Sequence, residues 1–239
     1  MERLGSDNGM MYERYERHIR LSQIGLAGQE KLKKASVLII GVGGLGSPIS
    51  LYLAAAGVGR IGIIDSDTVS VSNLQRQVLY TEDQVGSLKV SCARDRLLQA
   101  NSELIVDAYP FRLTSENAEE LIDSYDIVVD GCDNFATRYL IDDCCKKLTK
   151  PYVYGSIGEF HGQVSVFNYK DGISYRDLFP EPLTTDVSLP QGVMGVVPGV
   201  VGTLEAAEVI KIITGIGKLL VRQLLTIDIL TMEMQVISL

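Results

Sequence analysis

A run of glycines between two apolar segments constrains this chain more than any other feature. The sequence Gly-Val-Gly-Gly-Leu-Gly occupies residues 41–46. It follows the continuous apolar run Ser36–Ile40, which is typical of a strand buried on both faces. It precedes the small-residue segment 47–56, which we expect to be helical. Because glycine permits a tight turn and a close approach of helix to strand, these residues predict a strand–turn–helix unit.

Predicted strands alternate with predicted helices up to about residue 150. This alternation predicts an α/β fold with a doubly wound, mostly parallel, Rossmann-like sheet. Further strands are expected at 60–65, 105–109, 127–130, 151–156 and 162–167, and further helices at 88–100, 115–124 (capped by Thr114 or Ser115) and 137–148.

No linker, internal repeat or low-complexity segment divides the sequence, so we interpret residues 1–239 as one domain. Residues 10–34 are expected to form an N-terminal helical arm, and residues 35–150 the core. The stretch 170–191 contains three prolines and little periodicity, which predicts a long crossover loop. Residues 192–239 are expected to add a helix at 202–215 and two closing antiparallel strands at 219–228 and 232–237.

The composition excludes several classes of protein. The formal net charge of −8 argues against a surface that binds nucleic acid. Residues 35–59 carry no charge, but glycines break the run into pieces too short to cross a membrane. Four cysteines form no C-x-x-C pair, which argues against a thiolate zinc site. A bridge between the adjacent Cys144 and Cys145 would be strained, so reduced thiols and a cytoplasmic location are the simplest interpretation.

The glycine turn has the spacing G-x-G-x-x-G and indicates a nucleotide site, with residues 35–150 as the nucleotide-binding core. The following helix offers free N–H groups to an anion. Asp65 ends the next predicted strand, where a carboxylate can accept hydrogen bonds from ribose hydroxyls. A turn that serves packing alone is the alternative. These features do not distinguish NAD from ATP.

Charged residues after the later strands favour a triphosphate. An NAD-dependent dehydrogenase does not need Arg76 and Lys89 after its second strand, whereas cleavage of a triphosphate needs cations near phosphoryl oxygens. Asp133 follows another strand, where an acid can hold Mg²⁺. Taken singly, Arg76 and Lys89 could be solvated surface charges, and Asn134 could cap the helix that follows. Their joint placement at strand ends favours the functional interpretation.

The chain resembles the bacterial ThiF/MoeB/HesA adenylyltransferases, relatives of the ubiquitin-activating enzymes. The resemblance begins at residues 14–17 (Arg-Tyr-Glu-Arg) and extends nearly to the C-terminus. Its most specific motif is Ser-Asn-Leu-Gln-Arg-Gln at residues 72–77; the glycine motif, Asp133-Asn134 with Arg138, and residues 192–211 also match.

The resemblance implies ATP-dependent adenylylation of the C-terminal Gly-Gly carboxylate of a small ubiquitin-like sulfur-carrier protein. Pyrophosphate is released, and the carrier is primed for thiocarboxylate formation. The implied catalytic residues are Arg17, Arg76, Lys89 and Asp133, with Arg17 reaching across a homodimer and Asp133 organising Mg²⁺. The implied nucleotide-binding residues are Gly43, Gly44, Asp65 (ribose), Asp67, Ser72, Asn73 (phosphates), Gln75, Arg76, Lys89, Asp133 and Asn134.

The sequence also departs from this family. Many members bind one structural zinc through two C-x-x-C pairs, but Ser174 and Asp177 replace the first pair and the chain ends before a second. We therefore expect no zinc. Ser188 replaces a crossover-loop cysteine, which makes a thiol step through that loop doubtful. Cys132 is a weak substitute. His18 is expected to be structural, and His161 receives no role.

Other functions remain open from sequence. A related enzyme could act on another carboxylate, as in a tRNA-modification dehydratase, although the acidic surface and the Leu74-Gln75 pair weigh against this alternative. A non-catalytic scaffold of the same fold and an NAD(P)-dependent oxidoreductase are two further alternatives. The sequence does not identify the carrier, the sulfur donor or the pathway, which could lead to thiamin, molybdopterin, cysteine or another product.

Overall fold

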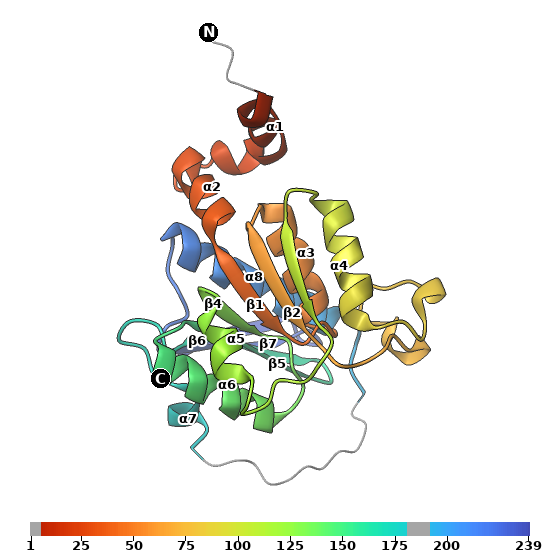
Figure 1. Ribbon diagram of the computed structural model, residues 1–239. Coiled ribbons are helices and arrows are strands. Elements are labelled where there is room, and N and C mark those ends of the chain that lie inside the picture. Colours follow the sequence, from red (N-terminus) through yellow and green to blue (C-terminus); the bar gives the residue numbers. More distant parts are fainter. Residues whose placement is uncertain (1–5, 181–191) are drawn as a thin grey trace.

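The protein is built around one central sheet of eight strands, seen in the computed structural model in Figure 1. The structure describes residues 6–180 and 192–239. The strand order is β3-β2-β1-β4-β5-β6-β7-β8; the first five strands are parallel and the last three run antiparallel. The strands are β1 (Ser36–Ile40), β2 (Arg60–Ile64), β3 (Ile105–Tyr109), β4 (Ile127–Asp130), β5 (Tyr152–Gly158), β6 (His161–Phe167), β7 (Gln223–Asp228) and β8 (Glu233–Ser238).

Helices cover both faces of the sheet, as the sequence predicts for a doubly wound fold. One apolar core joins the sheet to α3 (Gly46–Ala56), α4 (Lys89–Ala100) and α8 (Val196–Thr214). A second core joins the opposite face to α5 (Ala118–Asp123), α6 (Phe135–Leu148) and α7 (Tyr175–Leu178). Two short 3-10 helices, η1 (Val71–Asn73) and η2 (Glu82–Gln84), lie between β2 and α4.

The strand order reverses between β1 and β4, and we call this place the switch point of the sheet. The chain continues from β1 to β2 and β3 on one side, and then crosses to β4 and β5 on the other. The loops that follow β1 and β4 therefore leave in opposite directions and open a crevice at the carboxyl end of these strands. In open α/β sheets this crevice is where ligands bind.

The N-terminal arm consists of two helices, α1 (Ser6–Ile19) and α2 (Gly25–Lys34), where the sequence predicts one helical segment. Tyr15 of α1 is buried, and its hydroxyl accepts a hydrogen bond from Asn101 at the end of α4. Gln29 of α2 donates to the carbonyl oxygen of Ala56, the last residue of α3. Because α3 begins at the glycine turn and ends at Ala56, the arm is anchored at the opposite end of α3 from that turn.

The C-terminal half differs from the sequence prediction in two places. Helix α8 begins at Val196, earlier than the predicted start at residue 202. Pro198 lies within its first turn, where proline is tolerated, and Gly202 fits closely against the carbonyl oxygen of Leu45. The predicted crossover loop at 170–191 contains the short helix α7, and residues 181–191 lie outside the described part of the chain.

Helix α5 also begins later than predicted. It starts at Ala118 rather than at residue 115, and neither Thr114 nor Ser115 caps it. Instead, the side chain of Asn117 accepts a hydrogen bond from the backbone N–H of Thr114 and so closes the turn before the helix.

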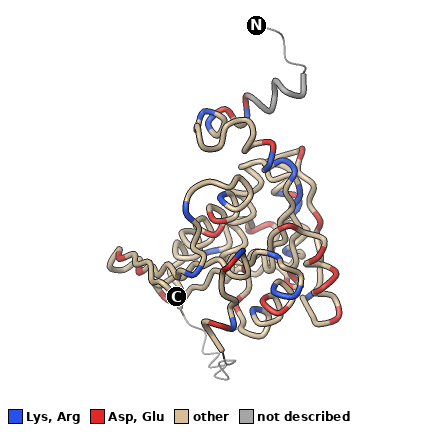
Figure 2. The backbone as a smooth tube through the Cα atoms, turned by 90° about the vertical axis from the view of Figure 1, so that its left-hand side faces the viewer, with Lys and Arg blue, Asp and Glu red and all other residues tan. Residues whose placement is uncertain are grey.

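Among the described residues, no helix is both long and apolar enough to span a membrane. Figure 2 shows acidic and basic residues interspersed along the described chain in that view.

A buried carboxyl group lies between α8 and the sheet. Glu205 is fully buried, and neither side-chain oxygen has a hydrogen-bond partner among the described residues. Gly155 on β5 leaves the space for it, because a Cβ at that position would collide with the carboxyl group. Burial raises the pKa of Glu205 well above its usual value; the charge of Asp130 adds to this shift and Arg138 opposes it. This acid therefore destabilises the fold when it ionises.

Replacement of this acid by its neutral isostere should stabilise the protein. The folded state retains a proton on Glu205 that the unfolded state releases, so wild-type stability falls as pH rises from the ordinary glutamate pKa toward the raised one. Glu205→Gln should remove that fall, because an amide does not ionise, and should raise the free energy of unfolding near pH 7 by about 1–3 kcal/mol. Urea unfolding of both proteins at several pH values measures the difference.

The neighbouring acid Glu208 provides the matched control. It is also buried, but it pairs with Lys211 and accepts a hydrogen bond from the backbone N–H of Leu220. Glu208→Gln should therefore lower the free energy of unfolding. A Glu205→Gln protein with unchanged or lower stability across this pH range would contradict the account of Glu205.

Candidate functional site

The glycine turn after β1 and the loop after β4 touch each other through their backbones. Gly41 has a positive φ of 93°, and a Cβ on it would lie 2.5 Å from the carbonyl oxygen of Gly131. A Cβ on Gly131 would in turn collide with the carbonyl oxygen of Gly41, and one on Gly46 would collide with the same oxygen. Only residues without side chains allow this contact, which brings the two loops of the switch point together.

Asp65 lies beside this turn at the end of β2. One carboxylate oxygen accepts the backbone N–H of Val42 at 3.1 Å, and the other accepts that of Asp67 at 2.9 Å. Burial raises the pKa of Asp65, while these hydrogen bonds and the charge of Lys89 oppose the shift. The carboxylate is thus fixed at the edge of the turn, in the position where the sequence predicts a ribose-binding acid.

Lys89 and Asp67 form an ion pair at the same edge. Lys89 begins α4, and its side chain is only 7% exposed. Its Nζ lies 3.0 Å from Asp67 Oδ2, and Asp67 is largely exposed. The interpretation of Lys89 as a freely solvated surface charge is therefore wrong, because the lysine is buried up to its ammonium group. One acidic partner leaves this ammonium group with donor capacity for a ligand.

The predicted phosphate-binding residues Asn73 and Arg76 lie on the 3-10 turn η1 and just after it. The Asn73 side chain accepts from the backbone N–H of Ser70 and so helps to cap this turn. Arg76 donates to the carbonyl oxygen of Ser72 at 3.0 Å, and its guanidinium group has no acidic partner among the described residues. Ser72 is exposed.

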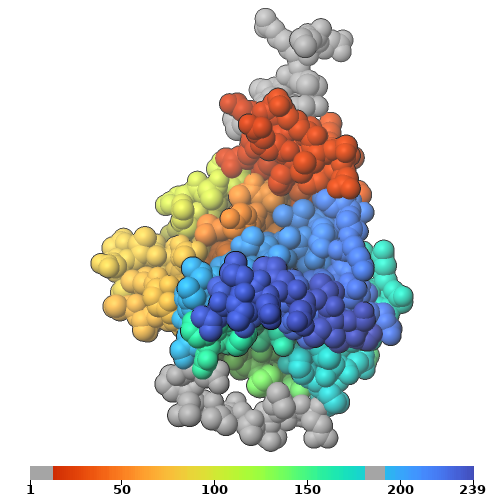
Figure 3. Space-filling model, turned by 180° about the vertical axis from the view of Figure 1, so that it is seen from behind, coloured from red at the N-terminus to blue at the C-terminus, as the bar shows by residue number. Residues whose placement is uncertain are grey.

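Gln75 lines an apolar cleft of about 780 Å³ between this segment, the first turns of α8 and β8. Gly195 permits the close approach, because a Cβ there would lie 2.6 Å from Gln75 Oε1. Figure 3 shows α8 and the C-terminal strands as one exposed face, with the segment around residues 71–88 at its border. The other lining residues are Val78, Met194, Val196, Gly199, Val200, Thr203, Leu204 and Met234.

A buried ionic network supports the loop after β4. Asp130 is fully buried and accepts hydrogen bonds at 2.9 Å from the guanidinium group of Arg138 and from the hydroxyl of Tyr152. Arg138 also donates to the carbonyl oxygens of Cys132 and Gly155. The sequence places Arg138 in a motif but assigns it no role. Its partners lie 6 to 17 residues away along the chain, so spacing alone could not reveal the network.

The thiol of Cys132 is part of this network. Its Sγ donates to Asp130 Oδ1 at 2.9 Å. Burial raises the pKa of Cys132 well above the usual thiol value, and the neighbouring carboxylate adds to the shift. A thiol held in its protonated form is a poor nucleophile. Cys132 is therefore unsuited to replace the cysteine that the crossover loop lacks.

Asp133 and Asn134, which follow this network, have different surroundings. Asp133 is exposed and has no hydrogen-bond or ion-pair partner among the described residues. Asn134 is the N-cap of α6, since its side chain accepts the backbone N–H of Thr137 at 2.9 Å. Its capping role is therefore confirmed. Within the described chain, no cluster of three or more His, Cys, Asp or Glu side chains is arranged to hold a metal ion.

Several predicted residues lie away from this crevice or outside the described chain. Arg17 is exposed on α1, close to Tyr15 and therefore at the end of α3 that is remote from the glycine turn. Ser188 lies outside the described residues. Ser174 and Asp177, where thiols would bind zinc in many family members, form a capping box that begins α7. The absence of zinc stays a prediction.

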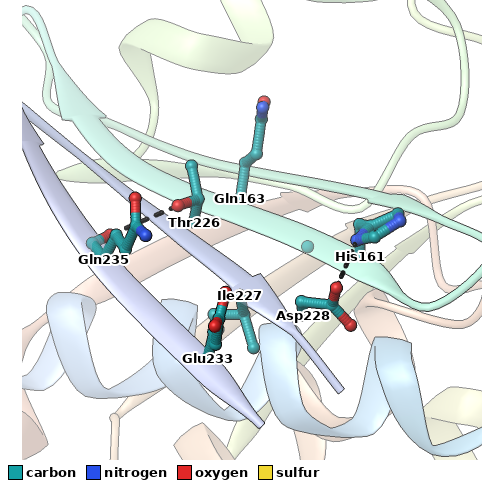
Figure 4. A pocket seen from close by; sticks show the side chains of 8 residues that line it. His161, Gln163, Thr226, Ile227, Asp228, Glu233 and Gln235 are labelled. Carbon is teal, nitrogen blue, oxygen red and sulfur yellow. Dashed lines mark hydrogen bonds and ion pairs between the residues drawn. The ribbon is translucent and has the colours of Figure 1, made fainter. Parts of the chain in front are cut away.

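The two histidines belong to different surroundings. His18 lies 3.2 Å from Gln29 Oε1, which confirms its structural role in the arm. His161 begins β6 and lies 3.7 Å from Asp228 in a hollow of about 330 Å³ on the C-terminal strands. Figure 4 shows His161, Asp228 and Glu233 on the adjacent strands β6, β7 and β8. Asp228 is paired with His161 in the β6–β7 register and with Glu233 in the β7–β8 register.

The buried pair of Arg138 and Asp130 should be essential for stability. Arg138→Met would leave the Asp130 carboxylate buried without its charge partner and should lower the free energy of unfolding by about 3–5 kcal/mol. Arg176→Met removes an exposed pair with Asp143 and should cost under about 1 kcal/mol. Urea unfolding compares the two variants, and equal losses would contradict the role of the buried network.

Comparisons with known proteins agree with this geometry. Residues 15–239 match the model of the ThiF family. A sulfur carrier protein adenylyltransferase of Thermus thermophilus is 51% identical over 227 residues, which cover 91% of this chain and 83% of that protein. A probable molybdopterin-synthase adenylyltransferase of Porphyra purpurea is 46% identical over 228 residues, which cover 94% of this chain and 60% of that protein. The chain thus spans less than two thirds of the Porphyra relative.

A solved structure shares the fold at lower identity. The crystal structure of E. coli MccB with ATP superposes with a TM-score of 0.85 at 26% identity, covering 98% of this chain and 73% of that one. The sheet order, the glycine turn and the carboxylate beside it define a doubly wound α/β protein with a site of the nucleotide-binding type. Within that class, the chain belongs to the ThiF family.

Proposed function

We propose that this protein uses ATP to adenylylate the C-terminal Gly-Gly carboxylate of a small ubiquitin-like sulfur-carrier protein. The observation that carries the proposal is the crevice itself. One edge of it holds the glycine turn, Asp65 and the buried Lys89, and the loop after β4 brings Asp133 to the same switch point. The names of the relatives from Thermus and Porphyra support adenylyl transfer as the reaction.

The reaction needs charge neutralisation more than proton transfer. The carrier carboxylate is already ionised at neutral pH. It attacks the α-phosphorus of ATP, the bond from that phosphorus to the bridging oxygen breaks, and pyrophosphate leaves with the electron pair. In this proposal Asp65 accepts from the ribose hydroxyls, while Lys89, Arg76 and Asn73 donate to phosphate oxygens. These donors offset the repulsion between two anionic reactants and stabilise the in-line transition state.

Mg²⁺ fits the residues at this crevice. Asp133 offers an exposed carboxylate without a protein partner among the described residues. Mg²⁺ is commonly held by one or two carboxylates together with substrate phosphates, so a dedicated cluster of protein ligands is not required. Asp133 would hold the ion, which when bound supplies positive charge to the phosphate oxygens.

Substitution of Asp133 should separate chemistry from folding. Asp133→Asn should lower carrier-dependent ATP–pyrophosphate exchange about 100-fold or more, because the substitution removes the carboxylate that holds the cation. Its melting temperature should not change, since Asp133 has no partner to lose. Asp95→Asn, an exposed position on α4, is the control and should retain full exchange.

The same assay tests the proposed function. Exchange should require a carrier that ends in Gly-Gly, and removal of the last glycine from the carrier should abolish it. Full exchange by Asp133→Asn with a confirmed carrier would contradict the role of Asp133. ATP turnover that needs tRNA in place of the carrier would instead favour an enzyme that acts on another carboxylate.

We also propose that the active form is a homodimer in which Arg17 serves the partner's site. Helix α3 has 11 residues, so it separates the two ends of the core by about 16 Å. Arg17 lies at the end remote from the glycine turn, which is too far for it to reach ATP bound in its own crevice. The apolar cleft beside α8, with the exposed side chains of Val196 and Met234, supports a contact with a second copy.

Mixing two inactive variants tests this arrangement. If Arg17 acts across the interface, a heterodimer of Arg17→Ala and Arg76→Ala chains contains one intact site and one site with both defects. Random reassociation of equal amounts should therefore restore about a quarter of wild-type exchange. If Arg17 acts within its own chain, every site keeps a defect and no activity returns. Exchange rates of the mixture against each variant alone provide the measurement.

The described residues offer no reactive thiol at the crevice for a later sulfur step, since the pKa of Cys132 is raised. We therefore propose that this chain performs the adenylylation and that a separate protein donates the sulfur.

A further inference from the structure

One buried amide beside the glycine turn has no partner. Gln77 is 4% exposed, and its Oε1 makes no hydrogen bond with the described residues. Its Nε2 is likewise without an acceptor among them. A buried amide oxygen without a donor costs about 1–3 kcal/mol relative to an apolar group of the same shape. Because a phosphate oxygen accepts hydrogen bonds and does not donate them, Nε2 rather than this oxygen is the atom that an anionic ligand could contact.

The backbone holds Gln77 firmly against the turn. Its N–H donates to the carbonyl oxygen of Asn73 at 2.9 Å, and its own carbonyl oxygen accepts the N–H of Tyr80 at 3.2 Å. The Tyr80 hydroxyl then donates to the carbonyl oxygen of Val42, within the glycine turn, at 2.7 Å. The unpartnered side chain is thus fixed relative to the turn by hydrogen bonds that do not involve its amide.

The amide points at the glycine turn. A Cβ on Gly43 would lie 3.5 Å from Gln77 Nε2. Because Gly43 has no side chain, the space between the amide and the turn is left open. The N–H groups of Gly43, Gly44 and Leu45 donate to no acceptor of the described residues. Helix α3 begins there without a side-chain cap and without an acidic residue in its first turn. Free N–H groups at a helix start form a site for an anion.

We propose that Gln77 is a further nucleotide-binding residue, whose Nε2–H donates to a phosphate oxygen of ATP bound at the glycine turn. This inference rests on the proposed function and deepens it. The amide adds a neutral donor beside Gly43, whereas the neighbouring Gly44 lies against Pro198 of α8 and the side chain of Arg76. A neutral donor can approach the phosphate without competing for the carboxylates of Asp65 and Asp67, unlike a lysine or arginine.

Two buried glutamines allow a matched experiment. Gln29 is as buried as Gln77, but both ends of its amide are bonded, to Ala56 and to His18. Calorimetric titration with ATP and Mg²⁺, without carrier, should show a rise in Kd of about 10- to 100-fold for Gln77→Met. The melting temperature of this variant should be equal to or above that of the wild type. Gln29→Met should show the reverse, with a lower melting temperature and unchanged Kd.

Two further measurements make the assignment specific. Gln77→Glu places a negative charge beside the phosphates and should weaken ATP binding more than Gln77→Met does. The Kd of adenosine should be the same for Gln77→Met and wild type if the amide contacts only phosphate. An equal loss of affinity for adenosine and ATP would overturn the phosphate contact.

The failure of this inference can be told from the failure of the proposed function. If Gln77→Met binds ATP as tightly as the wild type, or loses stability as Gln29→Met does, the role of Gln77 is wrong while ATP binding stands. If the wild-type protein binds no ATP, the proposed function itself fails.

Discussion

The rest of the site depends on the backbone contact between Gly41 and Gly131. This contact joins the loops after β1 and β4 at the one place where the sheet order reverses. Any side chain at either position would push the loops apart, because each Cβ would meet the other residue's carbonyl group. In the proposed function, this contact keeps Asp65 and Lys89 on one side of the crevice close enough to Asp133 on the other to bind one ligand.

Buried and exposed charges have separate tasks around this contact. Asp130 and Arg138 are both buried and satisfy each other, so they hold the loop after β4 but cannot meet a ligand. Asp133 and the guanidinium group of Arg76 have no ionic partner among the described residues. In the proposed function, a protein with a net charge of −8 binds an anionic nucleotide through local cationic and N–H groups, because the nearest donors matter more than the overall charge.

Much of the fold could be predicted from sequence because its cues are local. Most of the parallel strands are short apolar runs followed by a turn, and all five occur within a few residues of the predicted ranges. Helix α8 starts at Val196, before the predicted start at residue 202. Gly202 lies inside this helix and allows close contact with the residues around Leu45, which are far away in sequence. The break in the N-terminal arm and the short helix α7 had no periodic pattern long enough to be detected.

The sequence by itself determined the strand–turn–helix unit and its glycine turn. It also showed which acidic and basic residues follow the ends of the strands. Those features depend on residues that are neighbours along the chain. Only the tertiary structure decided that Lys89 is buried up to its ammonium group, that Arg138 belongs to Asp130, and that Gln77 and Glu205 keep buried polar groups without partners. It also placed Arg17 at the far end of α3. Burial and hydrogen-bond satisfaction depend on which distant segments pack together, and that is set by the sheet order rather than by any local pattern.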